Sequence, residues 1–118
     1  MLDISFYTNN GQSSYHVEVA DNLLEWLAGS EFAKIGEEKP RKIWIDGEKE
    51  TLPLVKLGKV NRKKLIEFFN DSIVNETKEI LNHLGESLIK EERIYRLKKL
   101  IELLDCIKDE KYQYLQRI

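Results

Sequence analysis

Apolar residues recur at spacings of three and four through the second half of the chain, which predicts amphipathic helices. Two series carry this pattern: Leu65, Phe69, Ile73, Ile80 and Leu84, then Ile94, Leu97, Ile101, Leu104 and Ile107. We predict a helix over about residues 62–84 with Asn61 as its N-cap. A second helix begins near residue 88, after a short link in which Gly85 takes the left-handed conformation. The short link makes the two helices antiparallel neighbours.

Apolar and polar residues alternate in the first half of the chain, which predicts β-strands. Residues 2–8 and 15–19 alternate on either side of an Asn-Asn-Gly-Gln segment at 9–12. Because Asn and Gly tolerate positive φ, this segment is typical of a hairpin turn. After the hairpin, Asp21 is expected to cap a short amphipathic helix.

Residues 41–57 form a second alternating segment. Asp46 and Gly47 at its centre are typical of a two-residue hairpin turn. Pro53 lacks an N–H group, so it is expected at a strand edge or outside the sheet. The two β-hairpins, residues 2–19 and 41–57, are therefore separated by the short helix.

These elements predict a single α+β domain over residues 1–118. A small antiparallel sheet packs against a C-terminal antiparallel helical hairpin. The composition, 42% hydrophobic and 34% charged, is that of a folded chain rather than a disordered one. We find no signal peptide and no membrane-spanning run, and the one cysteine excludes an intrachain disulfide. We therefore expect a cytoplasmic protein.

The helical pattern also predicts which side chains form the core of the helical hairpin. We expect Phe69, Ile73, Leu97, Ile101 and Leu104 to be buried against each other or against the sheet. Nothing between residues 108 and 117 interrupts a helix, so the pattern permits the second helix to continue to residue 117.

Basic residues cluster at the start of the first long helix, at Lys59, Arg62, Lys63 and Lys64. Such a cluster can neutralise phosphates, which makes nucleic-acid binding an alternative function. Acidic residues follow closely, however, and the net charge is −2, so a solvated helix face is the favoured interpretation.

Glu76, Glu79, His83 and Glu86 share one helix face, and carboxylates with imidazole can bind zinc or iron. A ferritin-type site needs Glu and His three apart on two helices, whereas here Glu79 and His83 are four apart and the second helix has no His. We therefore expect neither a metal nor another cofactor.

Cys106 could in principle form a catalytic dyad with His16 or His83. It falls on the apolar pattern of the second helix, and a free cysteine there is more often a small buried hydrophobe. We therefore expect no enzyme activity.

Two surfaces are candidates for binding a partner protein. If helices cover one face of the sheet, Tyr7, His16, Glu18 and Trp44 are left on the other face. Tyr and Trp are frequent anchors of protein interfaces. For Trp44, cover by the short helix or by the turn that follows it is the alternative.

The second candidate is the C-terminal segment. As a helical extension beyond the first long helix, it would leave Tyr112 and Leu115 without an intrachain partner. That arrangement would provide a basis for recruitment or for a homodimer through the C-terminal helix.

The function we infer is that of a non-catalytic protein-binding module, acting as an inhibitor, an immunity-type neutraliser or a regulator of another protein. The last step is an analogy with small charged α+β domains. The alternative is a nucleic-acid-binding regulator that uses the basic start of the helix at 62–84.

Overall fold

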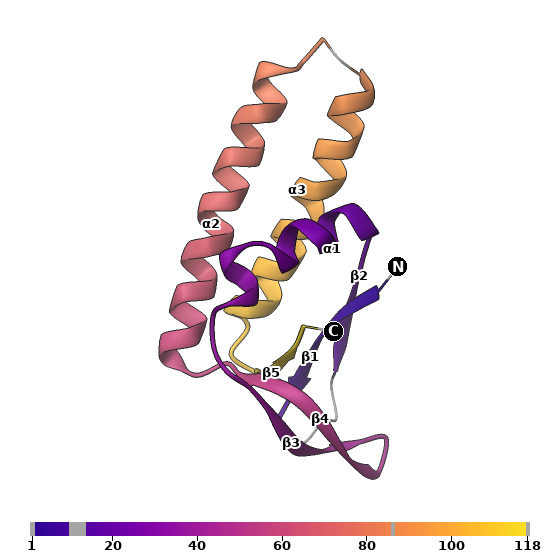
Figure 1. Cartoon of the computed structure of the whole chain (residues 1–118), viewed down its shortest axis with the longest axis vertical. Helices are drawn as coiled ribbons and strands as arrows, with labels where there is room; N and C mark the ends of the chain where they lie inside the picture. The colour runs from indigo at the N-terminus through magenta and orange to yellow at the C-terminus, as the bar shows by residue number, and fades with distance from the viewer. Residues whose placement is uncertain (1, 10–13, 86, 118) are drawn as a thin grey trace.

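The computed structural model describes residues 2–9, 14–85 and 87–117, with the backbone alone for 87–90. The elements in chain order are β1 (Leu2–Thr8), β2 (Tyr15–Val19), α1 (Asp21–Ala28), the 3-10 helix η1 (Glu31–Ala33), β3 (Glu38–Ile45), β4 (Glu48–Lys56), α2 (Lys59–Asn82), α3 (Ser87–Lys108) and β5 (Tyr112–Gln116). The strands form one antiparallel sheet in the order β2-β1-β5-β4-β3, and α2 and α3 form a long helical hairpin (Figure 1). The predicted α+β fold is confirmed.

The first predicted hairpin is present. β1 and β2 pair antiparallel from Leu2 opposite Val19 to Phe6 opposite Tyr15. Its predicted turn lies mainly outside the described residues, which omit 10–13. The alternation places Ile4 among the fully buried side chains of the core.

The second hairpin folds back where Asp46 and Gly47 both take positive φ, 50° and 81°. These are the conformations that a two-residue type I′ turn requires. β3 pairs with β4 along its whole length, whereas β5 pairs with β4 only at Val55 and Lys56. Pro53 therefore lies in a part of β4 that has a single neighbouring strand, where a missing N–H group is tolerated.

The C-terminal segment is a strand, so the helical extension to residue 117 that the pattern permitted is not present. α3 ends at Lys108, and β5 then enters the middle of the sheet between β1 and β4. Leu115 lies opposite Phe6 on one side and Val55 on the other. As a strand, this segment forms backbone hydrogen bonds with the edges of β1 and β4, which would otherwise be unpaired. These hydrogen bonds stabilise the strand more than the helical propensity of the segment stabilises a helix.

The predicted N-caps are also wrong. α1 has Ala20 at its N-cap position instead of Asp21, and α2 has Gly58 instead of Asn61. The Asn61 amide instead donates a hydrogen bond to the Lys56 carbonyl, 3.0 Å away. Gly85, expected in the left-handed conformation, does not take a positive φ.

The main core lies between the helices and one face of the sheet. It includes side chains from every element of the fold except β3, among them Phe6, Val17, Leu27, Phe32, Val55, Phe69, Leu103, Ile107 and Leu115. On the other face of the sheet, Tyr7, Ile43 and Leu54 form a second, smaller cluster. Both faces of the sheet are therefore partly covered.

The predicted helical core is right at Phe69 and Leu104, which are buried. It is wrong at Ile101, which is 42% exposed, and Ile73 and Leu97 are only half-buried. The face of α3 that meets the sheet instead carries Leu100, Leu103, Leu104 and Ile107. The periodicity of each helix predicts which of its faces is apolar, but the position of the sheet determines which residues of that face are buried.

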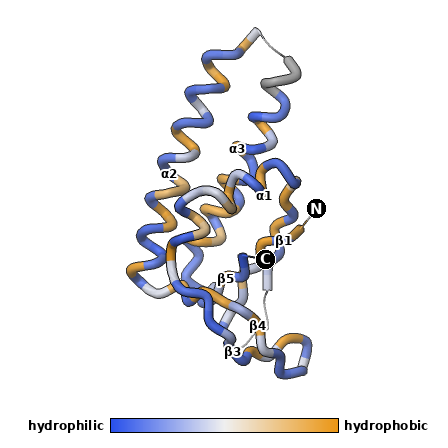
Figure 2. The backbone as a smooth tube through the Cα atoms, in the orientation of Figure 1, coloured by the Kyte–Doolittle hydropathy of each residue, from blue (hydrophilic) through white to orange (hydrophobic). Residues whose placement is uncertain are grey.

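The helical hairpin extends well beyond the sheet, and the β3–β4 hairpin projects at the opposite end of the molecule, whose longest extent is 51 Å (Figure 1). The distal half of the helical hairpin consists of residues 72–85, which cover the end of α2 and the loop after it, and of residues 87–98 of α3. We call this half the arm. Apolar residues continue along α2 within the arm (Figure 2). Among the described side chains of α2 after Phe69, however, Glu76 is the one that is buried.

Candidate interaction surfaces

Tyr7 is not available on the surface, contrary to the sequence-based expectation. Its side chain is only 5% exposed and packs with Ile43 and Leu54. Its hydroxyl donates to Gln116 Oε1 over 2.9 Å. Burial raises the pKa of the phenol above its ordinary value. Tyr7 is therefore an internal residue of the second cluster.

His16 and Glu18 are exposed on β2, the edge strand next to β1. His16 Nδ1 lies 2.7 Å from Ser5 Oγ, and the imidazole stands edge-on to the Tyr7 ring at 6.0 Å. Ser5 and His16 face each other directly across the two strands, so this contact is an ordinary cross-strand pair. β2 and β3 form opposite edges of the sheet, so His16 and Trp44 do not share a surface.

Trp44 is exposed, with 54% of its surface accessible, so the alternative in which the short helix or the turn after it covers this side chain does not hold. It lies near the turn of the β3–β4 hairpin, which projects away from the helices (Figure 1). Alternate residues of a strand share a face, so Trp44 lies on the same face as Lys42. Lys49 lies directly opposite Trp44 on β4. We call Lys42, Trp44 and Lys49 the hairpin surface.

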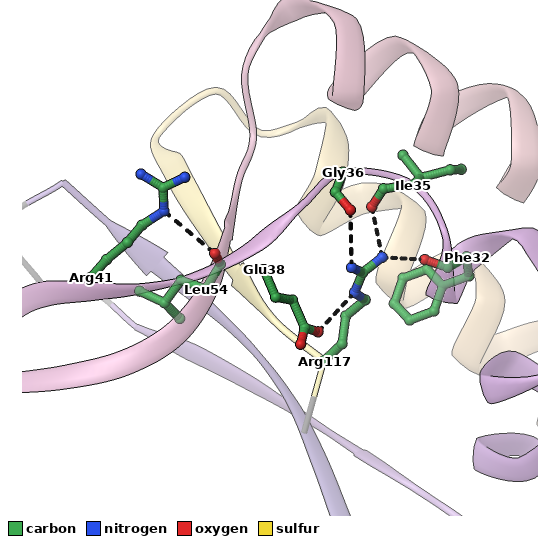
Figure 3. Close-up of polar contacts among 7 residues, drawn as sticks. All are labelled: Phe32, Ile35, Gly36, Glu38, Arg41, Leu54 and Arg117. Atoms are coloured by element: carbon green, nitrogen blue, oxygen red, sulfur yellow. Dashed lines mark hydrogen bonds and ion pairs between the residues drawn. The ribbon is translucent and has the colours of Figure 1, made fainter.

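The opposite face of the same hairpin is fixed to the sheet. Ile43 is buried there beside Leu54. The Arg41 guanidinium lies 5.7 Å from the centre of the Tyr114 ring, and its Nε donates to the Leu54 carbonyl over 3.4 Å (Figure 3). The hairpin is therefore held on one face and open on the other, which orients Trp44 outward.

The C-terminal candidate surface is not present. Tyr112 is nearly covered and Leu115 is fully buried, both in the main core. The premise of a homodimer through an extended C-terminal helix is therefore wrong, because this segment is the central strand. A period of two over five residues was too short to distinguish it from a helix end.

Arg62, a member of the predicted basic cluster, is a structural residue. Its guanidinium donates to four backbone carbonyls: those of Leu57 (3.0 Å), Ile107 (2.5 Å), Asp109 (3.2 Å) and Tyr112 (2.7 Å). Ile107 belongs to the last turn of α3, where the carbonyls lack helical partners and the helix dipole favours a cation. Arg62 thus joins the start of α2 to the end of α3 and the start of β5.

The rest of the basic cluster stays at the surface. Lys59, Lys63 and Lys64 are exposed, and a groove at the base of α2 places Lys59 and Lys63 beside Glu67 and Glu110. Removal from water lowers the pKa of Arg62, whereas the nearby Glu110 and Asp109 carboxylates oppose that shift. The cluster therefore presents three lysines rather than four cations, and acids lie among them.

Arg117 is a second structural arginine, and the sequence pattern gave no sign of it. Its Nη1 donates to the carbonyls of Phe32 (2.5 Å) and Ile35 (2.6 Å), and its Nε lies 3.2 Å from Glu38 Oε1 (Figure 3). These contacts fix the loop after α1 to the end of β5. A pocket of about 290 Å³ lies beside Arg117, and its walls are mainly apolar, including Leu24, Leu27 and Phe32.

The helix face that the sequence argues against as a metal site carries ion pairs. Glu76 Oε1 lies 3.2 Å from Arg93 Nη1, and Glu79 Oε2 lies 3.7 Å from Arg93 Nη2 and 3.5 Å from His83 Nε2. Glu86 lies outside the described residues. Within the described ranges, no group of three or more His, Cys, Asp or Glu is arranged to hold a metal ion.

Cys106 is buried in the main core. Burial raises the pKa of its thiol to about 12, and the carboxylates of Glu102, Asp105 and Asp109 act in the same direction. A thiol in this environment carries little thiolate at neutral pH, so it is a poor nucleophile.

Comparisons with protein-family models, curated proteins and solved structures found no match for this chain. In the part of the chain that the structure describes, no helix is both long enough and apolar enough to cross a membrane.

Proposed function

We propose that this chain is a non-catalytic protein-binding module and that the β3–β4 hairpin is its contact element. The observation that carries this proposal is the exposure of Trp44 on a projecting hairpin whose opposite face is fixed to the sheet. A rigid, solvent-exposed Trp loses little conformational entropy on binding and is among the commonest interface hot spots.

The hairpin surface also indicates the chemistry of the partner. Lys42 and Lys49 are exposed beside Trp44, and neither forms an ion pair with a described residue. Two unpaired cations around an aromatic side chain fit an apolar recess with an acidic rim. A projecting hairpin enters such a recess without rearrangement of the sheet.

The structure weakens the support for the alternative, a nucleic-acid-binding regulator. Arg62 is occupied by backbone carbonyls, and Lys59 and Lys63 lie among carboxylates. The hairpin surface carries only two cations among its three residues, and the net charge of the whole chain, with these two included, is −2. Phosphate recognition relies on several closely placed cations, so a protein partner is the better fit.

A module of this kind acts by occupying a surface of its partner. Inhibitors, immunity-type neutralisers and regulators all work in this way, and we propose that the chain belongs to this group. The buried Cys106 thiol and the buried cross-strand Ser5 hydroxyl support a non-catalytic role, because neither is placed to meet a substrate.

The test is affinity capture from native cells with the full chain, followed by calorimetry on the captured partner. Trp44→Ala should weaken binding at least about fivefold, and Lys49→Glu should weaken it most at low salt. Val60→Ala is the matched control, because Val60 is a highly exposed apolar residue at the start of α2.

Two results would contradict the proposal. One is a partner that binds wild type and Trp44→Ala equally. The other is tight binding of random single-stranded nucleic acid at physiological salt that is lost on substitution of Lys59, Lys63 and Lys64 but not of Trp44.

A further inference from the structure

The arm carries many aliphatic side chains that no part of the described chain covers. Leu81 is 61% exposed, and Val74 and Leu84 are also more than half exposed. Ile80, Ile94 and Leu97 are half-buried and belong to neither core cluster. Exposed aliphatic side chains gathered on one part of a protein are typical of an interaction site.

Apart from Leu97, these side chains lie on one side of the helical hairpin. Trp26 of α1 contacts both Phe68 of α2, at 6.0 Å between rings, and Arg96 of α3, at 5.5 Å from guanidinium to ring. α1 therefore covers the groove between the two helices on its own side. That contact defines a front face of the hairpin.

The apolar residues lie on the back. A helix turns about 100° per residue, so those of α2 lie roughly 120° to 240° around the axis from Phe68. They are Ile73, Val74, Ile80 and Leu81, and Leu84 follows them in the loop after α2. On α3, Ile94 and Ile101 lie roughly 140° to 160° from Arg96 by the same rotation. We call the six of these residues that lie in the arm, together with Ile101 just beyond it, the arm surface.

Two helices alone cannot enclose a core, whereas four can. We propose that the arm surface is a self-association site, at which a second copy of this chain packs its own arm to form an antiparallel four-helix bundle. An isologous interface needs a surface that is complementary to itself. The aliphatic side chains of the arm surface are complementary to the same side chains of a second copy. The charged side chains of α3 beside them are also complementary to their own copies.

Glu91 and Lys98 provide those charges. They are seven residues apart, so they share a face of α3, and Ile94 lies between them on that face. Both are exposed, and neither forms an ion pair within the described ranges. A two-fold axis at the level of residues 94 and 95 would bring each Glu91 beside Lys98 of the other copy.

The Glu76–Arg93 ion pair shows which part of α2 lies level with this axis. It places residue 76 of α2 level with residue 93 of α3. In antiparallel helices, residues 94 and 95 are then level with residues 74 and 75. Ile73 and Val74 lie at that position, so the axis that pairs the charges brings these two residues close to their counterparts. Leu81 then comes level with residue 68 of the other copy.

The first test is the molar mass of the full chain in solution, by sedimentation velocity. We expect a dimer at about 100 μM, and Leu81→Glu or Ile94→Glu should weaken it at least about tenfold. Val60→Glu is the matched control, since Val60 is just as exposed but lies outside the arm. Circular dichroism of each variant must show unchanged helix content.

The second test identifies the occupant as another copy in this orientation. Lys98→Glu and Glu91→Lys should each weaken the dimer, because each creates like-charge contacts at two symmetric places. The double variant should restore it. An equimolar mixture of the two single variants should form a heterodimer tighter than either homodimer.

A wild-type chain that is monomeric at about 100 μM would overturn the proposal. A dimer that survives Leu81→Glu and Ile94→Glu would also overturn it, as would a charge-swapped double variant no tighter than the singles. The hairpin surface is separate from the arm, so Trp44→Ala should leave the dimer unchanged. Failure of self-association is thus distinguishable from failure of the proposed partner binding.

Discussion

The helical hairpin has two parts, the arm and the base, which is the part of α2 and α3 next to the sheet. The two parts show the same apolar periodicity, yet they are packed in opposite ways. At the base, Leu65, Phe69, Leu103 and Ile107 are fully buried against the sheet. In the arm, aliphatic side chains are half-buried or exposed, and the buried residue of α2 is Glu76. Periodicity indicates which face of a helix is apolar, but it does not indicate whether anything covers that face.

The two regions also use charge differently. At the base, Arg62 donates to backbone carbonyls and closes the junction between α2, α3 and β5. In the arm, Glu76 and Glu79 pair with Arg93, whose Nε is buried without a hydrogen-bond partner among the described residues. At the base, polar groups have hydrogen-bond partners within the chain and apolar side chains are buried. In the arm, some apolar side chains are exposed, and Arg93 Nε lacks a hydrogen-bond partner among the described residues.

The comparison predicts its largest effect for a leucine at the base. Leu103→Ala should lower the free energy of unfolding by about 2–5 kcal/mol, because it leaves a cavity in a closed core. Ile101→Ala, two residues away on the exposed side, should cost less than about 1 kcal/mol. Denaturant melts measure both, and equal losses would contradict the assigned orientation of α3.

The next effect concerns Arg62. Arg62→Met should cost about 2–3 kcal/mol, because it leaves several buried carbonyls without a donor. Lys63→Met, at the exposed neighbouring position, should stay within about 0.5 kcal/mol of wild type. If the two variants melt alike, Arg62 does not close the junction as described.

A smaller effect is expected in the arm. Glu76→Gln removes a partly buried charge pair and should destabilise the arm locally, by about 1 kcal/mol. Native-state hydrogen exchange should therefore be faster for amides of residues 72–82 and unchanged for those of β5. Uniformly faster exchange would show that the arm and the base unfold as one unit, which would remove the distinction between them.

The smallest effect at neutral pH concerns the Cys106 thiol at the base. Its pKa of about 12 exceeds the ordinary value of 9.0, so the folded state holds the proton more tightly than the unfolded state. Stability is therefore unaffected below pH 9 and is lost as pH rises toward 12. At pH 8, alkylation should be at least about a hundredfold slower in the native protein than in denaturant. Rapid native alkylation would indicate an open base.

The local parts of the fold were predictable because their causes are local. Asp46 and Gly47 adopt the positive φ values that their residue types favour, and the alternation of residues 2–8 and 15–19 matches their strand pairing. The exposure of Trp44 was not fixed by these local patterns, because the short helix and the turn after it were both candidates to cover it.

The candidate site was predicted less well, because its burial depends on contacts that are distant in sequence. Tyr7 is covered by Ile43 and Leu54, which are more than thirty residues away. The helical extension expected for Tyr112 and Leu115 was replaced by a strand whose partners are β1 and β4. The roles of Arg62 and Arg117 depend on carbonyls that come together only after the sheet and helices have packed.

The sequence by itself determined the α+β class, the two β-hairpins and the antiparallel helix pair, because turn chemistry and periodicity act within a few residues. Only the tertiary structure decided that residues 112–116 complete the sheet and that the arm projects without cover. The physical reason is that open strand edges and helix-end carbonyls must find hydrogen-bond partners, and here those partners come from the far end of the chain.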